Sequence, residues 1–273
     1  MLERVDTARA AEFYKQRRFQ VGELRRQVIR DRMFRDFDED KGRLPDYIGV
    51  GVQRAGTSRL HSLLTAHPDV AEVYDPAWRV VKEIHWFDRP LIEDSEERDK
   101  AYASWFPAHE TRLMGEWTPR YLYDLWPIDR IQALCPDIKL LILLREPVSR
   151  LRSVIQFYSQ RGVTLNRDAL RESMWRGMYG AQLEYVFERF SRDQVFVGLY
   201  EQCNVAPAEE LVRLYKFLGL DTSFTPEGLD RRVNSSAKLD INSTLLSSAE
   251  SLYRGDRDKL ARVLPDVDFS IWD

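Results

Sequence analysis

One stretch of the chain, YIGVGVQRAGTSRLHSLL at residues 47–64, constrains the fold more than any other. A short β-rich run at 47–52 is followed by a glycine-containing turn and then by a helix expected over 58–66. Such a turn points backbone N–H groups and the N-terminus of the helix at an anion. Gly51 and Gly56 have the GxxxxG spacing of a nucleotide-binding P-loop. The stretch therefore predicts a phosphate-binding strand–loop–helix unit, with a purely structural turn as the alternative.

The same loop departs from that of a nucleoside triphosphatase. After Gly56 the chain reads Thr-Ser where such an enzyme has Lys followed by Ser or Thr, and the nearby cation is Arg54. The apolar run KLLILL at 139–144 ends in Arg145, whereas magnesium chemistry requires an Asp at the end of this strand. A cation there attracts phosphate and repels a metal. A P-loop kinase or NTPase acting with Mg-ATP is therefore the disfavoured alternative.

Apolar runs alternate with helical patterns along the rest of the chain. The uninterrupted run at 139–144 indicates a buried parallel strand, and another strand is expected over 194–200. Helices are expected over 148–160, 172–191, 207–218 and 245–264. This alternation predicts an α/β fold, with a P-loop-like parallel β-sheet flanked by helices on both faces.

The first part of the chain has a different character. Residues 7–38 are strongly charged, with apolar positions at loosely helical spacing, and a polar link follows at 38–45. We expect residues 1–44 to form an N-terminal helical extension and residues 45–273 to form the main domain. The extension is expected to pack on the surface of that domain, while a dimer contact or a lid over an acceptor are the alternatives.

Composition narrows the class of protein. The net charge of −3 argues against a protein that coats nucleic acid. No apolar run approaches the ~18 residues of a membrane span, and the charged N-terminus does not resemble a signal peptide. Cys135 and Cys203 lack metal-ligand spacing. We expect a cytoplasmic protein with reduced thiols and with no nucleic-acid or membrane partner, and homo-oligomer formation is left open.

Two motifs together resemble the sulfotransferase superfamily. QRAGTSRL is similar to its 5′-phosphosulfate loop, K/R-x-G-T-T/S, and the segment 145–153 matches its 3′-phosphate element, R-x-P-x-x-R-x-x-S. Without the motif, Arg150 and Arg152 fit a solvated helix face. The resemblance covers residues 45–273 and implies transfer of a sulfuryl group from 3′-phosphoadenosine 5′-phosphosulfate to a hydroxyl or amine, without a metal. A catalytically inactive nucleotide-binding homologue is the alternative.

The resemblance also implies a set of donor-binding residues. The 5′-phosphosulfate would be bound by the loop residues Arg54, Ala55, Gly56, Thr57 and Ser58. Arg145 and Ser153 would bind the 3′-phosphate. Tyr179, in a G-x-Y-x-x-x-L pattern, and Arg232, in the late loop RRVNSSAK, would approach the nucleotide. A solvated basic loop is the alternative for Arg232.

The segment KEIHWFD at 82–88 resembles the K-E-x-H-F-F-D element of the heparan-sulfate-type branch. This implies that Glu83 is the general base of an in-line displacement, with His85 as the second candidate and Lys82 assisting. His85 lies two residues after Glu83, so the two side chains share a side if the segment is extended.

One position departs from the family pattern. GEWTPRYLY resembles G-E-K-T/S-P-x-Y, but Trp117 replaces the lysine that would neutralise charge at the reacting sulfate. Lys82, Arg54 or His85 must then supply that charge, and Trp117 either stacks on an acceptor or belongs to the core. The aromatic residues of 70–125 and 160–180 favour a small-molecule acceptor with an apolar or aromatic part: Tyr74, Trp78, Trp86, Trp105, Phe106, Trp117, Tyr121, Trp126 and Trp175.

Overall fold

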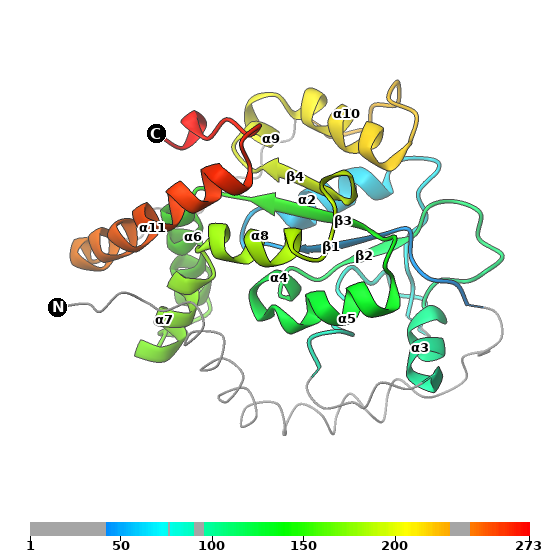
Figure 1. Cartoon of the computed structure of the whole chain (residues 1–273), viewed down its shortest axis with the longest axis horizontal. Helices are drawn as coiled ribbons and strands as arrows, with labels where there is room; N and C mark the ends of the chain where they lie inside the picture. The colour runs from blue at the N-terminus through cyan, green and yellow to red at the C-terminus, as the bar shows by residue number, and fades with distance from the viewer. Residues whose placement is uncertain (1–41, 76, 90–95, 230–240) are drawn as a thin grey trace.

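The computed structural model describes residues 42–75, 77–89, 96–229 and 241–273. The expected N-terminal helical extension and Arg232 lie outside these residues. Four parallel strands form one sheet, in the order β2 (Gly115–Trp117), β1 (Tyr47–Gly51), β3 (Lys139–Leu144) and β4 (Val195–Leu199). Helices flank this sheet (Figure 1), which confirms the α/β prediction.

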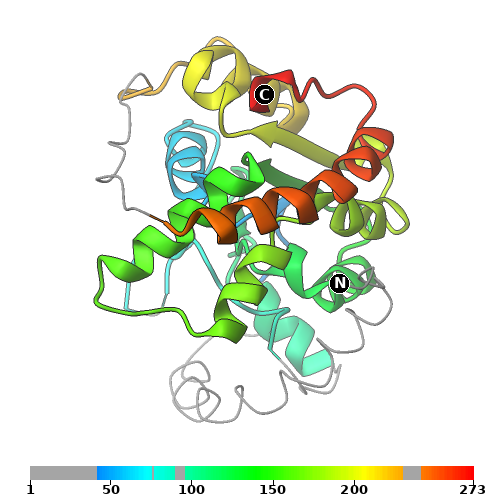
Figure 2. The same cartoon turned by 90° about the vertical axis from the view of Figure 1, so that its left-hand side faces the viewer.

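The described helices lie mostly between the strands in sequence. They are α2 (Thr57–Thr65), α3 (Glu96–Ala103), α4 (Tyr121–Asp124), α5 (Trp126–Leu134), α6 (Pro147–Ser159), α7 (Arg167–Trp175), α8 (Tyr179–Phe187), α9 (Gln202–Val205), α10 (Pro207–Leu218) and α11 (Ser243–Val263). Two short 3₁₀ helices, η1 (Arg192–Gln194) and η2 (Ser270–Trp272), complete the set. The long helix α11 packs beside α6 and α8 (Figures 1 and 2). No helix in the described part of the chain is long and apolar enough to cross a membrane.

The expected helix over 172–191 is wrong, because the structure has two helices, α7 and α8, with a break at Gly177. A Cβ on Gly177 would lie 2.7 Å from the ring of Tyr253 in α11. Helix α11 therefore approaches the backbone at this break, a contact between distant segments that helical periodicity does not reveal.

The strands bring several loops to one edge of the sheet. In a parallel sheet all carboxyl ends lie on the same side, where ligands of open α/β folds bind. The turn after β1 carries Arg54, β3 is followed by Arg145, and β4 is followed by Tyr200. Strands β1 and β4 are buried throughout and β3 at all but its first residue, so this edge is built on a rigid base.

Candidate active site

The turn after β1 has the backbone of an anion-binding loop. Arg54 and Gly56 have positive φ angles of 69° and 85°, and Gly56 is the N-cap of α2. A Cβ on Gly56 would lie 2.8 Å from the ring of Tyr200, so glycine is required by both conformation and space. No side chain in the described part of the chain caps this N-terminus. Its amide groups are therefore available to an anion.

Two arginines and a serine from the two sequence motifs lie together beside this loop. Arg145 donates from Nη1 to the carbonyl oxygen of Arg54 at 3.0 Å, and Arg54 donates from Nε to Ser153 Oγ at 3.2 Å. The guanidinium groups stack at 4.5 Å on aromatic rings, Arg54 on Phe157 and Arg145 on Tyr200. The predicted 5′ and 3′ elements therefore form one cluster.

The charges of this cluster favour an anionic ligand. Burial lowers the pKa of Arg54, and the neighbouring positive charges of Arg145 and Arg161 lower it further. Arg145 Nε is buried and has no hydrogen-bond partner among the described residues. Because like charges destabilise each other at close range, a phosphate between them would relieve the repulsion.

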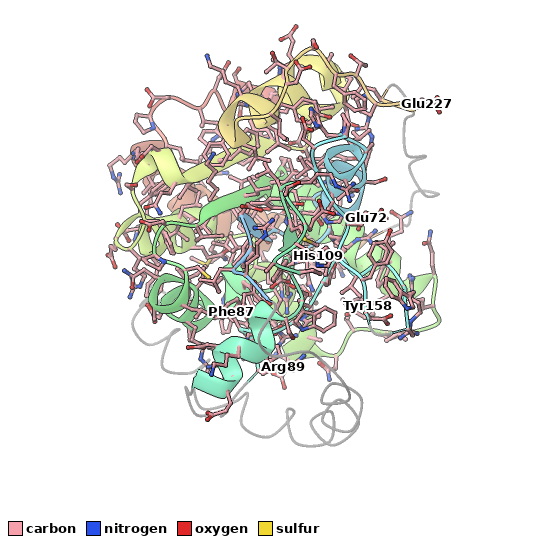
Figure 3. All side chains as sticks on the ribbon, turned by 90° about the vertical axis from the view of Figure 1, so that its right-hand side faces the viewer. Glu72, Phe87, Arg89, His109, Tyr158 and Glu227 are labelled. Carbon is pink, nitrogen blue, oxygen red and sulfur yellow. The ribbon has the colours of Figure 1, made fainter. Side chains whose placement is uncertain are left out.

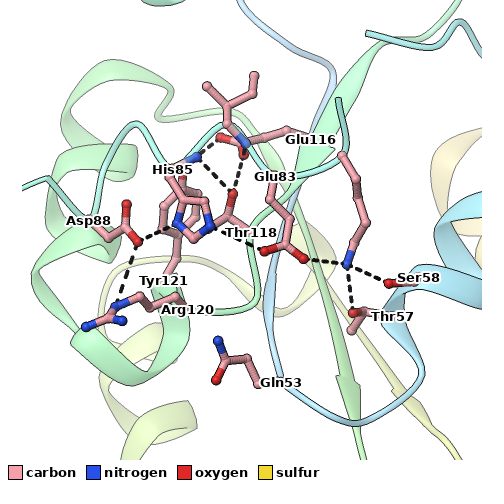
Figure 4. A network of polar contacts seen from close by, with 12 residues as sticks. Gln53, Thr57, Ser58, Glu83, His85, Asp88, Glu116, Thr118, Arg120 and Tyr121 are labelled. Carbon is pink, nitrogen blue, oxygen red and sulfur yellow. Dashed lines mark hydrogen bonds and ion pairs between the residues drawn. The ribbon is translucent and has the colours of Figure 1, made fainter. Parts of the chain in front are cut away.

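A lysine joins the donor loop to the proposed base. Lys82 Nζ donates to Thr57 Oγ1 at 3.1 Å, to Ser58 Oγ at 3.3 Å and to Glu83 Oε1 at 2.9 Å (Figure 4). Lys82 therefore bonds directly both to the predicted donor-binding residues Thr57 and Ser58 and to the predicted base Glu83. Lys82 thus brings a cation to the donor loop of a chain in which Trp117 replaces the family lysine.

His85 lies between two carboxylates. Its Nε2 is 3.3 Å from Glu83 Oε2, and its Nδ1 is 2.8 Å from Asp88 Oδ2 (Figure 4). Burial alone would lower the pKa of His85, but the bonds to Asp88 and Glu83 outweigh it and raise the pKa to about 9. Burial would raise the pKa of Glu83, but the hydrogen bonds and positive charges of His85 and Lys82 outweigh it, and the pKa lies below its ordinary value. At neutral pH Glu83 is therefore a carboxylate beside an imidazolium.

This charge state separates the two candidates for the base. An imidazolium has no free lone pair, so His85 cannot accept a proton near neutral pH, whereas Glu83 can. Asp88, the last residue of the KEIHWFD motif, was not singled out from the sequence. Its role as the partner of His85 becomes visible only when the chain turns at His85, whose φ is +55°.

Comparison with known proteins settles the family. A family model described as the sulfotransferase domain matches residues 44–243. This chain belongs to the sulfotransferase family.

Named relatives agree with this assignment, and solved structures share the fold. The chain is 32% identical over 206 residues to heparan sulfate glucosamine 3-O-sulfotransferase 3A1 of Homo sapiens, covering 69% of this chain and 47% of the relative. It thus spans about half the length of the curated relatives it matches. A sulfotransferase from Alicyclobacillus acidocaldarius superposes with a TM-score of 0.68 at 24% identity, over 84% of this chain and 99% of the other. The sulfotransferase domain of the curacin biosynthetic pathway superposes with a TM-score of 0.54 at 15% identity, over 82% and 99%. These two structures support the fold.

Tyr179 and two arginines of α6 have distinct structural positions. Tyr179 is fully buried, and its hydroxyl donates to the carbonyl oxygen of Arg145 at 2.9 Å. It therefore stabilises the backbone directly after β3. Arg150 is also fully buried and donates to the carbonyl oxygen of Ser173, so a solvated helix face is the wrong interpretation for it. Arg152 is exposed, as that interpretation expects.

Trp117 belongs to the core. Its side chain is fully buried, its indole Nε1 donates to the carbonyl oxygen of Gly51 at 3.1 Å, and its ring occupies the space where Gly49 has no side chain. Stacking on an acceptor is therefore excluded for Trp117. Half of the other aromatic residues expected at the acceptor are buried as well, namely Trp86, Trp105, Phe106 and Tyr121.

A neutral histidine that was not singled out from the sequence lies near Lys82 and Glu83. His61, on α2, is buried. Burial, and then the positive charge of Lys82, lower the pKa of His61 to about 4. Its position one turn after Thr57 was readable from helical spacing, but its proximity to Lys82 was not. Among the described residues no group of His, Cys, Asp and Glu side chains is arranged to bind a metal ion.

Proposed function

We propose that this sulfotransferase transfers the sulfuryl group of 3′-phosphoadenosine 5′-phosphosulfate to a hydroxyl or amine of a small-molecule acceptor. The observation that carries the proposal is the set of Lys82 bonds, which join Thr57 and Ser58 of the donor loop to Glu83. The loop and the first turn of α2 would bind the 5′-phosphosulfate. The cluster of Arg54, Arg145 and Ser153 would neutralise the phosphate charges.

The residues assign a role to each group in an in-line displacement. The acceptor oxygen or nitrogen attacks sulfur, and the bond between sulfur and the 5′-phosphate oxygen breaks. Glu83 accepts the proton that the acceptor loses, while His85 keeps the carboxylate oriented. Lys82 and the amide groups of α2 stabilise the charge on the sulfuryl oxygens and on the departing phosphate.

The acceptor would meet an exposed hairpin next to the catalytic segment. Tyr74 and Val80 pair across this hairpin, and with Trp78, whose side chain is 84% exposed, they place three apolar side chains on the surface. The Tyr74 hydroxyl donates to Glu72, which is labelled in Figure 3, at 2.9 Å. The hairpin leads directly into Lys82, which supports an acceptor with an aromatic or apolar part.

A carbohydrate is the second acceptor class. It is supported by the relatives that are named heparan sulfate glucosamine 3-O-sulfotransferases 3A1 and 3B1. The two classes separate in one assay, in which a simple phenol and a heparan sulfate oligosaccharide are offered to the same enzyme.

The experiment measures turnover of the phosphosulfate donor with either acceptor in the wild type and in Glu83→Gln. We expect Glu83→Gln to lose about 10²- to 10⁴-fold in kcat, the usual contribution of a general base. Binding of 3′-phosphoadenosine 5′-phosphate should change by less than about twofold, because Glu83 does not belong to the donor cluster.

The matched control is Glu188→Gln, an exposed glutamate at the end of α8, which should leave kcat unchanged. Retained turnover in Glu83→Gln would refute the base assignment. Turnover with the oligosaccharide and none with the phenol would refute the small-molecule acceptor.

A further inference from the structure

A buried carboxyl group is bonded to the backbone of the catalytic segment, residues 82–88. Glu116, in β2, is fully buried. Its Oε2 accepts hydrogen bonds from the backbone N–H of Ile84 at 3.0 Å and from Thr118 Oγ1 at 2.6 Å. Its Oε1 accepts from the hydroxyl of Tyr121 at 2.8 Å and from that of Tyr102 at 3.3 Å. Four donors thus converge on one carboxyl group.

Two of these partners, Thr118 and Tyr121, accept hydrogen bonds from the next backbone amides of the segment. The backbone N–H of His85 donates to Thr118 Oγ1 at 3.2 Å. The backbone N–H of Trp86 donates to the Tyr121 hydroxyl at 2.8 Å, and that of Phe87 donates to the same oxygen at 3.4 Å. We call Glu116, Thr118 and Tyr121 the Glu116 network (Figure 4). This network therefore accounts for four consecutive amides, those of residues 84–87.

The segment needs such an external partner. Residues 84–87 lie in neither a helix nor a strand, so no regular ladder satisfies their N–H groups. His85 also has a φ of +55°, a conformation that is unfavourable for any residue with a side chain. A backbone of this kind persists only where surrounding contacts specify it.

The chemical nature of Glu116 agrees with a role beyond packing. Burial raises the pKa of Glu116 to about 7, even though Thr118, Ile84 and Tyr121 donate to it. A buried acid lowers stability relative to an apolar side chain of the same volume unless its hydrogen bonds are all made. Here they are made to the segment that carries Glu83 and His85.

We propose that the Glu116 network is the positioning device of the catalytic segment, fixing Glu83 and His85 relative to Lys82 and the donor loop. Its three members come from a single stretch, GEWTPRY, in which strand β2 passes into helix α4. The inference rests on the proposed role of Glu83 as the base. Among the described residues, the side-chain hydrogen bonds of the network go to residues 84–87 and Tyr102 and not to the donor cluster or the exposed hairpin, so the network should affect the chemical step and not the affinity for the donor.

Two tyrosines offer a matched test. Tyr121→Phe removes the hydroxyl that accepts from Trp86 and Phe87, while Tyr102→Phe removes a hydroxyl that bonds the same carboxyl group but no amide of the segment. Both tyrosines are fully buried, so both variants keep a ring in the core. We expect Tyr121→Phe to lower kcat by about 10- to 100-fold, the effect of a displacement of order 1 Å at a reacting group. The Kd for 3′-phosphoadenosine 5′-phosphate should stay within about twofold, and Tyr102→Phe should keep kcat within about twofold.

Hydrogen exchange supplies a readout that does not depend on turnover. In Tyr121→Phe the amides of Trp86 and Phe87 should exchange at least about tenfold faster, while those of β1 and β3 keep their protection. Thr118→Val is the second variant and should do the same to the amide of His85.

Equal kcat losses in Tyr121→Phe and Tyr102→Phe, or unchanged exchange at 86 and 87, would overturn the inference. If Glu83→Gln retains turnover, the proposed base fails. The exchange pattern still decides whether the Glu116 network orders this segment.

Discussion

The imidazole of His85 is bonded on both nitrogens by carboxylates, and these bonds decide its charge over the working range of pH. Asp88 is the closer partner, at 2.8 Å from Nδ1, and its side chain is only 7% exposed. Because the pKa of His85 is raised to about 9, the imidazolium persists through neutral pH and is lost only above that value. The ion pairs contribute stability that is fully present below the unfolded pKa of about 6.5 and disappears as pH rises through about 9.

Asp88→Asn should therefore shift the alkaline limb of the pH–rate profile. The substitution removes the hydrogen bond to a charged acceptor, and burial then lowers the pKa of His85. We expect the descending limb of kcat/KM to move from near pH 9 downward by about one unit or more. The check is the profile together with an NMR titration of the His85 ring, and Asp137→Asn, at an exposed position, is the control. A His85 titration that stays near pH 9 in the variant would contradict the assignment.

The residues of the donor cluster could be predicted from sequence, while the burial of Trp117 and Arg150 could not. Arg54, Arg145 and Ser153 lie in short motifs whose spacing matched the family pattern, and the structure brings them together. Trp117 could not be placed from sequence, because its burial depends on the absence of a side chain at Gly49 in the neighbouring strand. The burial of Arg150 has the same kind of origin, since the carbonyl that it meets belongs to Ser173 on another helix. Contacts between elements carry no local signal.

At the scale of elements, the junction between β1 and α2 depends on one glycine. Gly56 has a φ of +85° and faces the ring of Tyr200, on which Arg145 stacks. Gly56→Ala should reduce stability by about 1–2 kcal/mol through the left-handed conformation. It should also raise the Kd for 3′-phosphoadenosine 5′-phosphate by at least about tenfold, because the new methyl group displaces the Tyr200–Arg145 pair.

Gly219, at the C-terminus of α10, separates these two effects. Its φ of +81° is nearly the same, but a Cβ there would meet no atom within 4 Å. Gly219→Ala should therefore show a similar loss of stability with unchanged nucleotide affinity, measured by thermal unfolding and by calorimetry. Equal nucleotide affinities in the two variants would show that the Gly56 turn is not part of the donor site.

Long apolar elements were predictable, and short ones were not. The strands expected over 47–52, 139–144 and 194–200 correspond to β1, β3 and β4, because burial on both faces leaves continuous apolar runs. Strand β2 has three residues, too few to show any period. Yet β2 contains Glu116, so the strand that carries the centre of the Glu116 network was the one hardest to detect.

At the scale of the whole molecule, a chain with a net charge of −3 still places a local group of cations at one edge of the sheet. The carboxyl ends of β1 and β3 place Arg54 and Arg145 beside each other, although the two residues are far apart in sequence. The parallel topology therefore creates a local anion site without a basic surface overall. Such a site should bind nucleotides with different affinities according to which positions of the ribose carry phosphate groups.

Thermal unfolding with different nucleotides tests that discrimination in the intact protein. At about 100 times its Kd, a ligand that binds only the native state adds about 2.7 kcal/mol, which raises Tm by about 5–10 °C for a chain of this size. We expect this shift with 3′-phosphoadenosine 5′-phosphate in EDTA, and a much smaller one with adenosine 5′-phosphate, which lacks the group that Arg145 and Ser153 would bind. Mg-ATP should produce little shift, because the strand that would supply a magnesium ligand ends in a cation. A shift with Mg-ATP alone would replace the sulfuryl donor by a nucleoside triphosphate, and the absence of any shift would indicate a sulfotransferase fold that has lost its donor site.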